Sequence, residues 1–311
     1  MKIYKGLETE FNCKNPVVTI GTFDGLHIGH QKIIERLKEE AKKINGESVL
    51  LTFYPHPRSV IESDHPISLL QAHEDKLLEL EKLGLQHLII LPFTNELSTM
   101  SAYNFIKDIL VAHIKLKKIV LGYDHHFGNN REGNLDFLNK HAQIMDFEVI
   151  EIPAKEIDEI KISSTKIREA IKNGEIEKAT KFLGKPYGIS GVVIKGKQLG
   201  RTIGYPTANI VPVEPLQLLP EIGVYAVKIQ VLNQIYTGLL NIGIRPTVEE
   251  SGDMKLEVHI FDFSENLYDE KMQVLIFERI RDEKKFASIE ALKAQIKEDE
   301  IIARSYFMHL D

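Results

Sequence analysis

Hydrophobic and polar positions form two kinds of pattern along the first half of the chain. Short apolar runs recur at 17–20, 49–53, 87–91, 118–121 and 147–152. Stretches with apolar residues at helical spacing follow at 31–44, 74–83, 103–114, 135–145, 164–172 and 175–182. Apolar strands separated by helices are typical of a parallel sheet that is covered on both faces. We therefore predict an α/β domain in this half.

The pattern changes after residue 184. The segments 187–194, 223–232, 235–242, 256–263 and 272–280 are strand-like, with tight turns such as Asn233-Gln234 and no helical pattern between them. Partial alternation of apolar and polar residues, as in 224–231, favours an antiparallel barrel or sandwich. Two helical segments, 288–297 and 299–308, close the chain. We therefore expect two domains, 1–184 and 185–311.

Composition narrows the classes of function. The 311 residues are 43% hydrophobic and 27% charged, which is ordinary for a soluble globular protein. The formal net charge of -6 provides no basic field for nucleic acid. The only cysteine, Cys13, excludes an internal disulfide and fits a reducing compartment. Because neither a signal peptide nor an apolar run of about 20 residues is present, we expect a cytoplasmic protein without a membrane partner. We expect a monomer or weak homo-oligomer.

The first candidate for chemistry is the run 21–30, GTFDGLHIGH, between a predicted strand and a predicted helix. In open α/β sheets ligands bind at the carboxyl ends of strands, and helix N-termini attract phosphate. The imidazoles of His27 and His30 could hold a polyphosphate there. Gly21 and Gly29 allow the backbone to approach a ligand, and the Asp24 carboxylate suits a hard cation such as Mg²⁺.

Other interpretations of the two histidines remain open from the residues alone. His27 and His30 could cap the helix or pack in a core. They could also bind zinc together with His56, since a His-x-x-His spacing can place both rings on one face of a helix. Short motifs also match by chance.

Three further segments lie at predicted strand ends or helix starts. Residues 52–57, TFYPHP, end the second strand, and their prolines fix a stiff loop. Residues 122–128, GYDHHFG, follow the strand 118–121. In 163–168, SSTKIR, hydroxyls and free backbone N–H groups at a helix start suit an anion, and Arg168 adds a charged fork. A simple strand end and an N-cap are the alternatives.

In this order, the four segments resemble the adenylyltransferase half of the bifunctional riboflavin kinase/FMN adenylyltransferases, over residues 14–170. The resemblance includes the His-x-Gly-His signature of nucleotidyltransferases. It implies a Rossmann-like domain that transfers AMP from ATP to FMN, with Mg²⁺, and releases pyrophosphate. It implies catalytic roles for His27, His30 and Arg168, ATP binding by Gly21, Phe23, Asp24, Gly29, Ser163, Ser164 and Thr165, and flavin binding by Pro55, His56, Pro57, Asp124 and Phe127. His126 departs from the family, whose members often carry arginine there.

The second half has a glycine-rich stretch, 191–204, that follows a predicted strand. Its N–H groups could bind a phosphate, although it is not a P-loop and could be an ordinary flexible hairpin. Thr207 and Asn209 share one face of an extended segment and suit an oxygen-coordinated Mg²⁺. Glu257 and His259 share one face of an apolar strand, where the pattern alone favours solvent-facing residues.

Together these pieces resemble riboflavin kinase over residues 185–310. The resemblance implies that Glu257 is the general base on the ribityl 5′-hydroxyl and that Thr207 and Asn209 bind the magnesium nucleotide. It implies ATP binding by Gly191, Gly196, Gly200, Arg201, Gly204 and Pro206, and a loop on the flavin side with Arg281, Asp282 and Phe286. The two halves together imply riboflavin, FMN and ATP as substrates, and FMN and FAD as products. An enzyme with one live activity and a non-catalytic flavin-binding regulator are the alternatives.

Overall fold

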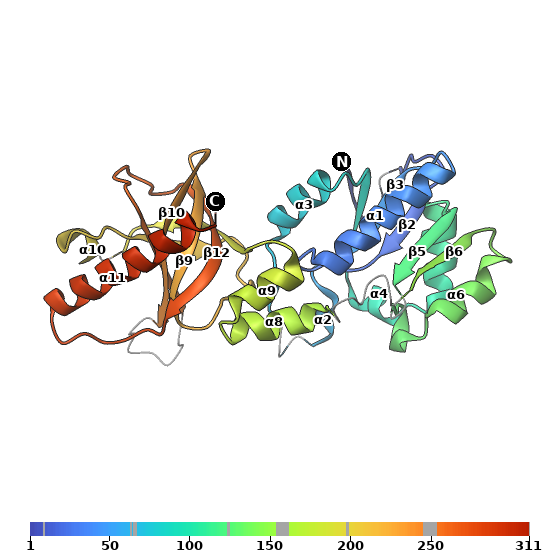
Figure 1. Ribbon diagram of the computed structural model, residues 1–311. Helices are drawn as coiled ribbons and strands as arrows, with labels where there is room; N and C mark the ends of the chain where they lie inside the picture. The colour runs from blue at the N-terminus through green and yellow to red at the C-terminus, as the bar shows by residue number, and fades with distance from the viewer. Residues whose placement is uncertain are drawn as a thin grey trace. The chain divides into compact units, whose positions relative to one another are not determined.

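The computed structural model describes residues 1–8, 10–62, 64, 67–122, 125–153, 162–196, 199–244 and 254–310. It divides into two compact units, drawn in Figure 1. The first comprises Met1–Ile67 and Glu74–Ser163, and the second comprises Ser68–His73 and Ser164–Asp311. The domain boundary expected near Gly184 separates the residues that perform the two expected reactions, and it stays a prediction.

Within the described residues, the first unit contains a six-stranded sheet in the order β1-β4-β3-β2-β5-β6, with every pair parallel. The strands are β1 (Lys2–Lys5), β2 (Val17–Ile20), β3 (Ser48–Tyr54), β4 (His87–Pro92), β5 (Lys118–Gly122) and β6 (Glu148–Ile152). The predicted parallel sheet is confirmed. The sequence did not indicate β1, because this edge strand is short and mostly exposed.

Helices cover both faces of this sheet (Figure 1). They are α1 (Ile28–Lys43), α2 (Pro57–Ile61), α3 (His73–Lys82), α4 (Asn95–Thr99), α5 (Ala102–Asn104), the π-helix η1 (Phe105–His113), the 3-10 helix η2 (Asn129–Arg131) and α6 (Leu135–Ala142). On one face Leu37 of α1 and Leu80 of α3 pack in one core, and on the other Ile106 of η1 and Leu138 of α6 pack in a second. Successive residues of the central strands pack alternately in one core and in the other.

The second unit is a closed antiparallel barrel in the order β10-β11-β8-β7-β12-β9. Its strands are β7 (Tyr187–Ile194), β8 (Ala208–Pro212), β9 (Gly223–Val231), β10 (Gln234–Ile244), β11 (Met254–Ile260) and β12 (Lys271–Arg281). The predicted barrel is confirmed. The sequence pattern missed β8, a five-residue strand that ends in proline, and the short helix α10 (Leu199–Thr202) inside the glycine-rich stretch.

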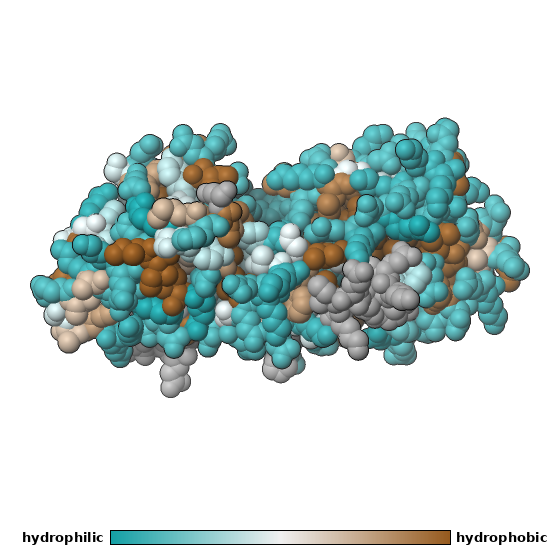
Figure 2. Space-filling model, viewed as in Figure 1, coloured by the Kyte–Doolittle hydropathy of each residue, from teal (hydrophilic) through white to brown (hydrophobic). Residues whose placement is uncertain are grey.

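The chain ends in one helix, α11 (Ile289–Met308), and not in the two that we predicted. The reason is the role of Asp299: its carboxylate binds Arg281 and does not cap a new helix. Ala303 and Phe307 of α11 pack on Val224 and Leu239 of the outer barrel face. Apolar atoms also gather on the outside of this helix (Figure 2), where Ile301 and Met308 are among the exposed residues.

Two further parts complete the second unit. The helices α8 (Ser164–Lys172) and α9 (Ile176–Leu183) belong to it, and α9 contacts β12. The segment Ser68–His73 lies along residues 216–218: the amide of Leu69 donates to the carbonyl of Leu216 (2.7 Å), and that of Leu218 donates to Leu69 (2.8 Å). Two separate pieces of chain therefore build this unit. None of its helices, nor of those in the first unit, is both long and apolar enough among the described residues to cross a membrane.

Candidate active sites

The first unit has a point of strand-order reversal at β2. From β2 the chain proceeds to β3 and β4 on one side, and then crosses to β5 on the other. Ligands of open α/β sheets bind at the carboxyl ends of the strands that flank such a reversal. The run 21–30 follows β2, residues 122–128 begin at the end of β5, and residues 55–57 follow β3. Three of the four predicted segments therefore meet at one edge of the sheet.

Three rings form a stack in the loop after β2. The ring of His30 lies between those of Phe23 and His27, with centroid separations of 4.6 Å and 3.7 Å. His27 is the N-cap of α1: its Nδ1 accepts a hydrogen bond from the amide of His30 (3.3 Å). The capping interpretation is therefore correct for His27. The same contact places both imidazoles at the positive end of the helix dipole, where an anion is favoured.

The backbone of this loop adopts conformations that ordinary residues avoid. Phe23 and Leu26 have φ values of 48° and 43°. A Cβ on Gly21 would lie 2.9 Å from the ring of Phe23, so glycine is required where the ring folds back. Such strained loops are held only where the surroundings enforce them, and they concentrate at ligand sites.

A lysine that the sequence did not single out also holds this loop. The Nζ of Lys76, on α3, donates to the carbonyl of Thr22 (3.2 Å). In the sequence Lys76 looks like any solvated lysine on an amphipathic helix, and only the fold brings it to the loop. Asp24 is buried there, with 5% of its surface exposed.

The residues expected near the flavin differ in their surroundings. His56 is the N-cap of α2, which begins at Pro57, so the proline pair starts a short helix where we expected a stiff loop. Phe127 is a buried core residue that packs against Phe105, and a Cβ on Gly133 would lie 2.7 Å from its ring. Asp124 lies outside the described residues.

The segment 163–168 crosses the division between the units. Ser163 belongs to the first unit, whereas Ser164, Thr165 and Arg168 belong to the second, on α8. The Nε of Arg168 donates to the carbonyl of Ser68 (2.7 Å) within that unit. The approach of this segment to ATP therefore stays a prediction.

The structure does not support the zinc interpretation of His27, His30 and His56. Within the described ranges, one group of three side chains brings metal-ligating atoms together, and it consists of Cys13, Glu47 and His87.

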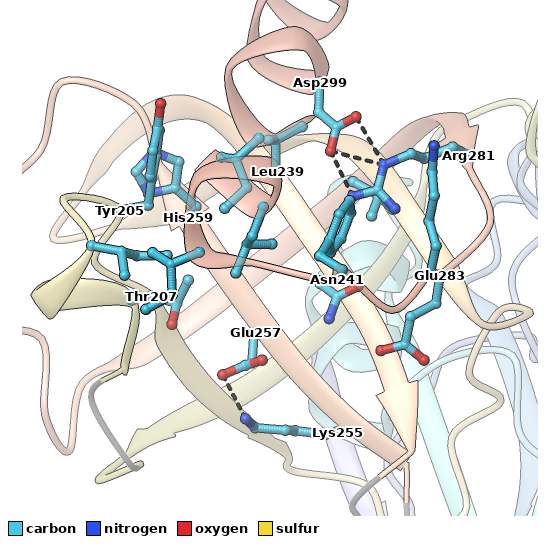
Figure 3. A pocket seen from close by; sticks show the side chains of 18 of the residues that line it. Tyr205, Thr207, Leu239, Asn241, Lys255, Glu257, His259, Arg281, Glu283 and Asp299 are labelled. Carbon is cyan, nitrogen blue, oxygen red and sulfur yellow. Dashed lines mark hydrogen bonds and ion pairs between the residues drawn. The ribbon is translucent and has the colours of Figure 1, made fainter. Parts of the chain in front are cut away.

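The second unit contains a cavity of about 450 Å³ on the outer face of the barrel. It lies between the strands β9, β10 and β11 on one side and α11 with the preceding loop on the other. Figure 3 shows Glu257 and Thr207 among its labelled residues. The loop and helix contribute apolar side chains, including Phe286, Leu292 and Ile296.

Three polar side chains occupy one row across the barrel strands. Glu257 of β11 pairs in register with Asn209 of β8 on one side and with Asn241 of β10 on the other. Leu256 and Val258 are buried in the barrel, so Glu257 faces outward together with His259. The face is outward, as the pattern indicated, but it lines a pocket. Lys255, on the same face, approaches Glu257 to 2.6 Å (Figure 3).

The glycine-rich stretch lies directly over this row. A Cβ on Gly196 would lie 2.1 Å from Nδ2 of Asn209. A Cβ on Gly200 would lie 2.2 Å from the carbonyl of Tyr205 and 3.3 Å from the hydroxyl of Thr207. These positions have no room for a side chain, because the backbone itself covers the candidate magnesium ligands.

An ion pair closes the opposite side of the cavity. The guanidinium of Arg281 donates to both carboxylate oxygens of Asp299, at 2.8 and 2.9 Å (Figure 3). Asp299 is only 1% exposed. The ring of Phe286 lies 5.7 Å from the guanidinium carbon. The sequence pattern did not indicate a role for Asp299, because an acidic residue in an amphipathic helix is usually exposed to solvent.

A second cavity of about 240 Å³ adjoins the first. Arg201, Pro206 and Thr207 line it together with Leu267 and Tyr268. Thr207 lines both cavities, so it marks the place where their contents meet.

The comparisons with known proteins agree with this arrangement. The family model for FAD synthetase matches residues 10–166, and that for riboflavin kinase matches residues 183–307. A protein of Buchnera aphidicola subsp. Schizaphis graminum, described as bifunctional riboflavin kinase/FMN adenylyltransferase, is 39% identical over 99% of both chains. The chain belongs to this family. Members from Escherichia coli K12 (37% identical, 99% of this chain, 98% of that one) and Listeria monocytogenes (38%, 97% and 96%) are similar over their whole length.

One solved structure shares the complete fold. It is described as a macrolide-efflux protein from Streptococcus pneumoniae, and it matches with a TM-score of 0.88 and 32% identity, over 98% of this chain and 99% of that one. The efflux activity in that description concerns that protein, and its similarity to this chain is one of fold.

Proposed function

We propose that this bifunctional riboflavin kinase/FMN adenylyltransferase phosphorylates riboflavin to FMN and then adenylylates FMN to FAD, with ATP in both steps. Residues 185–311 perform the first reaction, and residues 1–184 the second. Membership of the family along the full length carries the proposal. The side chains at the strand ends of the first unit and those that line the cavity of the second unit support it.

In the kinase reaction, riboflavin occupies the larger cavity. Its flat ring system suits the apolar side facing α11, with Phe286 and Leu292. Glu257 on the opposite side accepts the proton of the ribityl 5′-hydroxyl while that oxygen attacks the γ-phosphorus of ATP. The bond from this phosphorus to the bridging oxygen breaks, and ADP leaves with the electron pair.

ATP occupies the smaller cavity, and the glycine-rich stretch covers its phosphates. The guanidinium of Arg201 lines this cavity and can pair with a phosphate oxygen. Because Thr207 lines both cavities, the γ-phosphoryl group meets the riboflavin hydroxyl beside it. Holding both reactants in adjoining pockets supplies most of the catalysis, since phosphoryl transfer depends on positioning and charge stabilisation.

The donor set at this place fits Mg²⁺. The amide oxygen of Asn209 and the hydroxyl of Thr207 are hard oxygen ligands, and Asn209 is buried beneath Gly196 and next to Glu257. When bound, Mg²⁺ neutralises charge on the phosphates. In the first unit, the carboxylate of Asp24 is the proposed ligand of Mg²⁺.

In the adenylyl transfer, a phosphate oxygen of FMN attacks the α-phosphorus of ATP, and pyrophosphate leaves. His27 and His30 donate hydrogen bonds to phosphoryl oxygens at the helix N-terminus and stabilise the charge that develops. Lys76 fixes the loop through Thr22. Arg168 and the hydroxyls of 163–165 bind the triphosphate, and residues 55–57 with Asp124 and Phe127 form the flavin side. No covalent enzyme intermediate is required.

A product time course tests the proposal. The purified chain is incubated with riboflavin, ATP and Mg²⁺, and the flavins are separated by chromatography. We expect FMN to appear first and FAD to follow. Formation of FMN without FAD would mean that only the kinase reaction is active. Bound flavin without ADP or pyrophosphate would favour a regulator.

The single cysteine also supports a cytoplasmic location, and we keep a monomer or weak homo-oligomer as part of the proposal.

A further inference from the structure

The opposite edge of the sheet in the first unit carries a second cluster of reactive side chains. Cys13 precedes β2, Glu47 immediately precedes β3, and His87 is the first residue of β4. Their ligating atoms all lie within 4.8 Å of one another. Because the strands are parallel, this amino-terminal edge is remote from the carboxyl-terminal edge with His27. Neither proposed reaction uses the cluster.

The backbone around Cys13 is fixed to the start of β3. The amide of Lys14 donates to Oε2 of Glu47 (2.7 Å), and the amide of Glu47 donates to the carbonyl of Lys14 (3.0 Å). A Cβ on Gly46 would lie 2.3 Å from the carbonyl of Asn15, so the two segments are in close contact. The thiol and the carboxylate are therefore held near each other before any ligand binds.

His87 is oriented from both of its ring nitrogens. The imidazole is 1% exposed and lies against the rings of Tyr4 (5.9 Å) and Phe11 (5.7 Å). Its Nδ1 lies 3.2 Å from the hydroxyl of Tyr4, and its Nε2 lies 3.4 Å from Oε2 of Glu47. A histidine that binds a metal through one nitrogen usually hydrogen-bonds through the other, and the Tyr4 contact provides that arrangement.

We propose that Cys13, Glu47 and His87 bind one thiophilic divalent cation of the zinc class. Thiolate, carboxylate and imidazole form a donor set that zinc prefers, with water as the fourth ligand. Tetrahedral bonds of about 2.0–2.3 Å place ligand atoms about 3.5 Å apart. The 3.4 Å separation of His87 Nε2 and Glu47 Oε2 already meets this value, and the ligand atoms of all three residues lie within 4.8 Å of one another.

Charge balance also favours the cation. On binding, the S–H proton leaves to solvent and the metal–sulfur bond replaces it. Thiolate and carboxylate then balance the double positive charge.

Cobalt(II) provides a direct test, because it occupies zinc sites and gives an intense near-ultraviolet charge-transfer band when a thiolate binds it. The metal-free full chain, without a histidine tag, is titrated with Co²⁺. Cys13 is the only cysteine in the sequence, so any such band must come from it. We expect one Co²⁺ per chain with this band, and its loss on addition of Zn²⁺. Saturating Co²⁺ without the band would overturn the proposal.

Two variants and a matched control complete the test. Cys13→Ser should abolish the band, and Glu47→Gln should weaken Co²⁺ binding by about tenfold or more. Glu39→Gln neutralises a carboxylate of the same unit that pairs with Arg36 at the surface, and it should leave binding unchanged. Circular dichroism verifies that each variant is folded. If Cys13→Ser misfolds, the Glu47→Gln titration decides, and unchanged affinity there refutes the site.

Discussion

Glu257 and Asn209 face each other in direct register across β11 and β8, on the outer face of the barrel. Both side chains project from strands, so their separation is set by sheet geometry and not by a loop. The proposed general base and a proposed magnesium ligand are thus placed side by side before substrates bind. Such preorganisation lets both groups act without rearrangement when substrates bind.

Removal of the proposed base should stop one reaction only. Glu257→Gln keeps the size of the side chain but cannot accept the hydroxyl proton, so we expect FMN formation to fall by about 10²–10⁴-fold. Conversion of supplied FMN to FAD should be unchanged. Chromatography measures both, and Glu270→Gln, an exposed position immediately before β12, is the control. Normal riboflavin phosphorylation by Glu257→Gln would exclude it as the base.

A methyl group at Gly196 should disturb the metal ligand beneath it. The new Cβ would lie 2.1 Å from Nδ2 of Asn209, and the amide must move away. We expect Gly196→Ala to weaken Mg²⁺ binding at the kinase site, which raises the half-saturating Mg²⁺ concentration for FMN formation, while FMN adenylylation continues. An unaltered magnesium titration would argue against Asn209 as a ligand.

The pair Arg281–Asp299 should matter for both stability and riboflavin phosphorylation. Asp299→Asn leaves the guanidinium without its buried countercharge, which costs about 3 kcal/mol in comparable pairs. We expect a lower melting temperature for the barrel transition and weaker riboflavin binding, because Arg281 lines the pocket. Glu298→Gln makes the same chemical change at the neighbouring exposed position and should alter neither. Equal effects of both variants would contradict the role of the ion pair.

The two histidines at the start of α1 should be needed for FAD formation alone. His30→Ala removes the middle ring of the stack, and we expect FAD formation to fall by about 10²–10³-fold while FMN formation persists. His27→Asn is sharper, because asparagine retains an N-cap acceptor and removes only the imidazole. If folded His27→Asn still forms FAD at the original rate, capping is the sole role of His27.

His125 should make the first unit sensitive to acid. Burial, with a smaller effect of His126, lowers the pKa of His125 to about 4. An unfolded histidine binds its proton near pH 6.5, so the unfolded state holds more protons between about pH 6.5 and about pH 4, and stability falls as pH drops through this window. The loss between about pH 7 and about pH 5 is about 2 kcal/mol.

Urea unfolding at the two pH values measures this loss. His125→Gln cannot take up the proton and should show a smaller difference in unfolding free energy between them. His113→Gln, on η1 in the same unit, is the control. An unchanged pH difference in His125→Gln would mean that other groups cause the acid sensitivity.

Much of the architecture follows from local patterns. The apolar runs of β2 to β5 and the alternation in β11 each identify a strand, because burial on two faces or one leaves a distinct signature. The edge strand β1 and the short strand β8 lack that signature, since few of their side chains are buried. The sequence pattern predicts two helices at 288–297 and 299–308, whereas α11 continues through Asp299, whose carboxylate binds Arg281.

The candidate sites were predictable to the extent that their residues are sequence neighbours. The run 21–30 and the pair Thr207/Asn209 are contiguous, and spacing alone places them. Lys76, Lys255 and Asp299 reach their sites from elements whose pattern is that of a solvated face, so no local signal exists for them. The cluster of Cys13, Glu47 and His87 is assembled from three strand beginnings, and only sheet order reveals it.

The piece Ser68–His73 has a consequence for how the molecule is made. Leu69 leaves the ribosome long before Leu216 and Leu218, its hydrogen-bond partners, have been synthesised. The barrel unit therefore combines an early and a late part of the chain. A cut of the polypeptide at Ser163 or at Gly184 would therefore leave Ser68–His73, a piece of the second unit, on the fragment that carries the first unit.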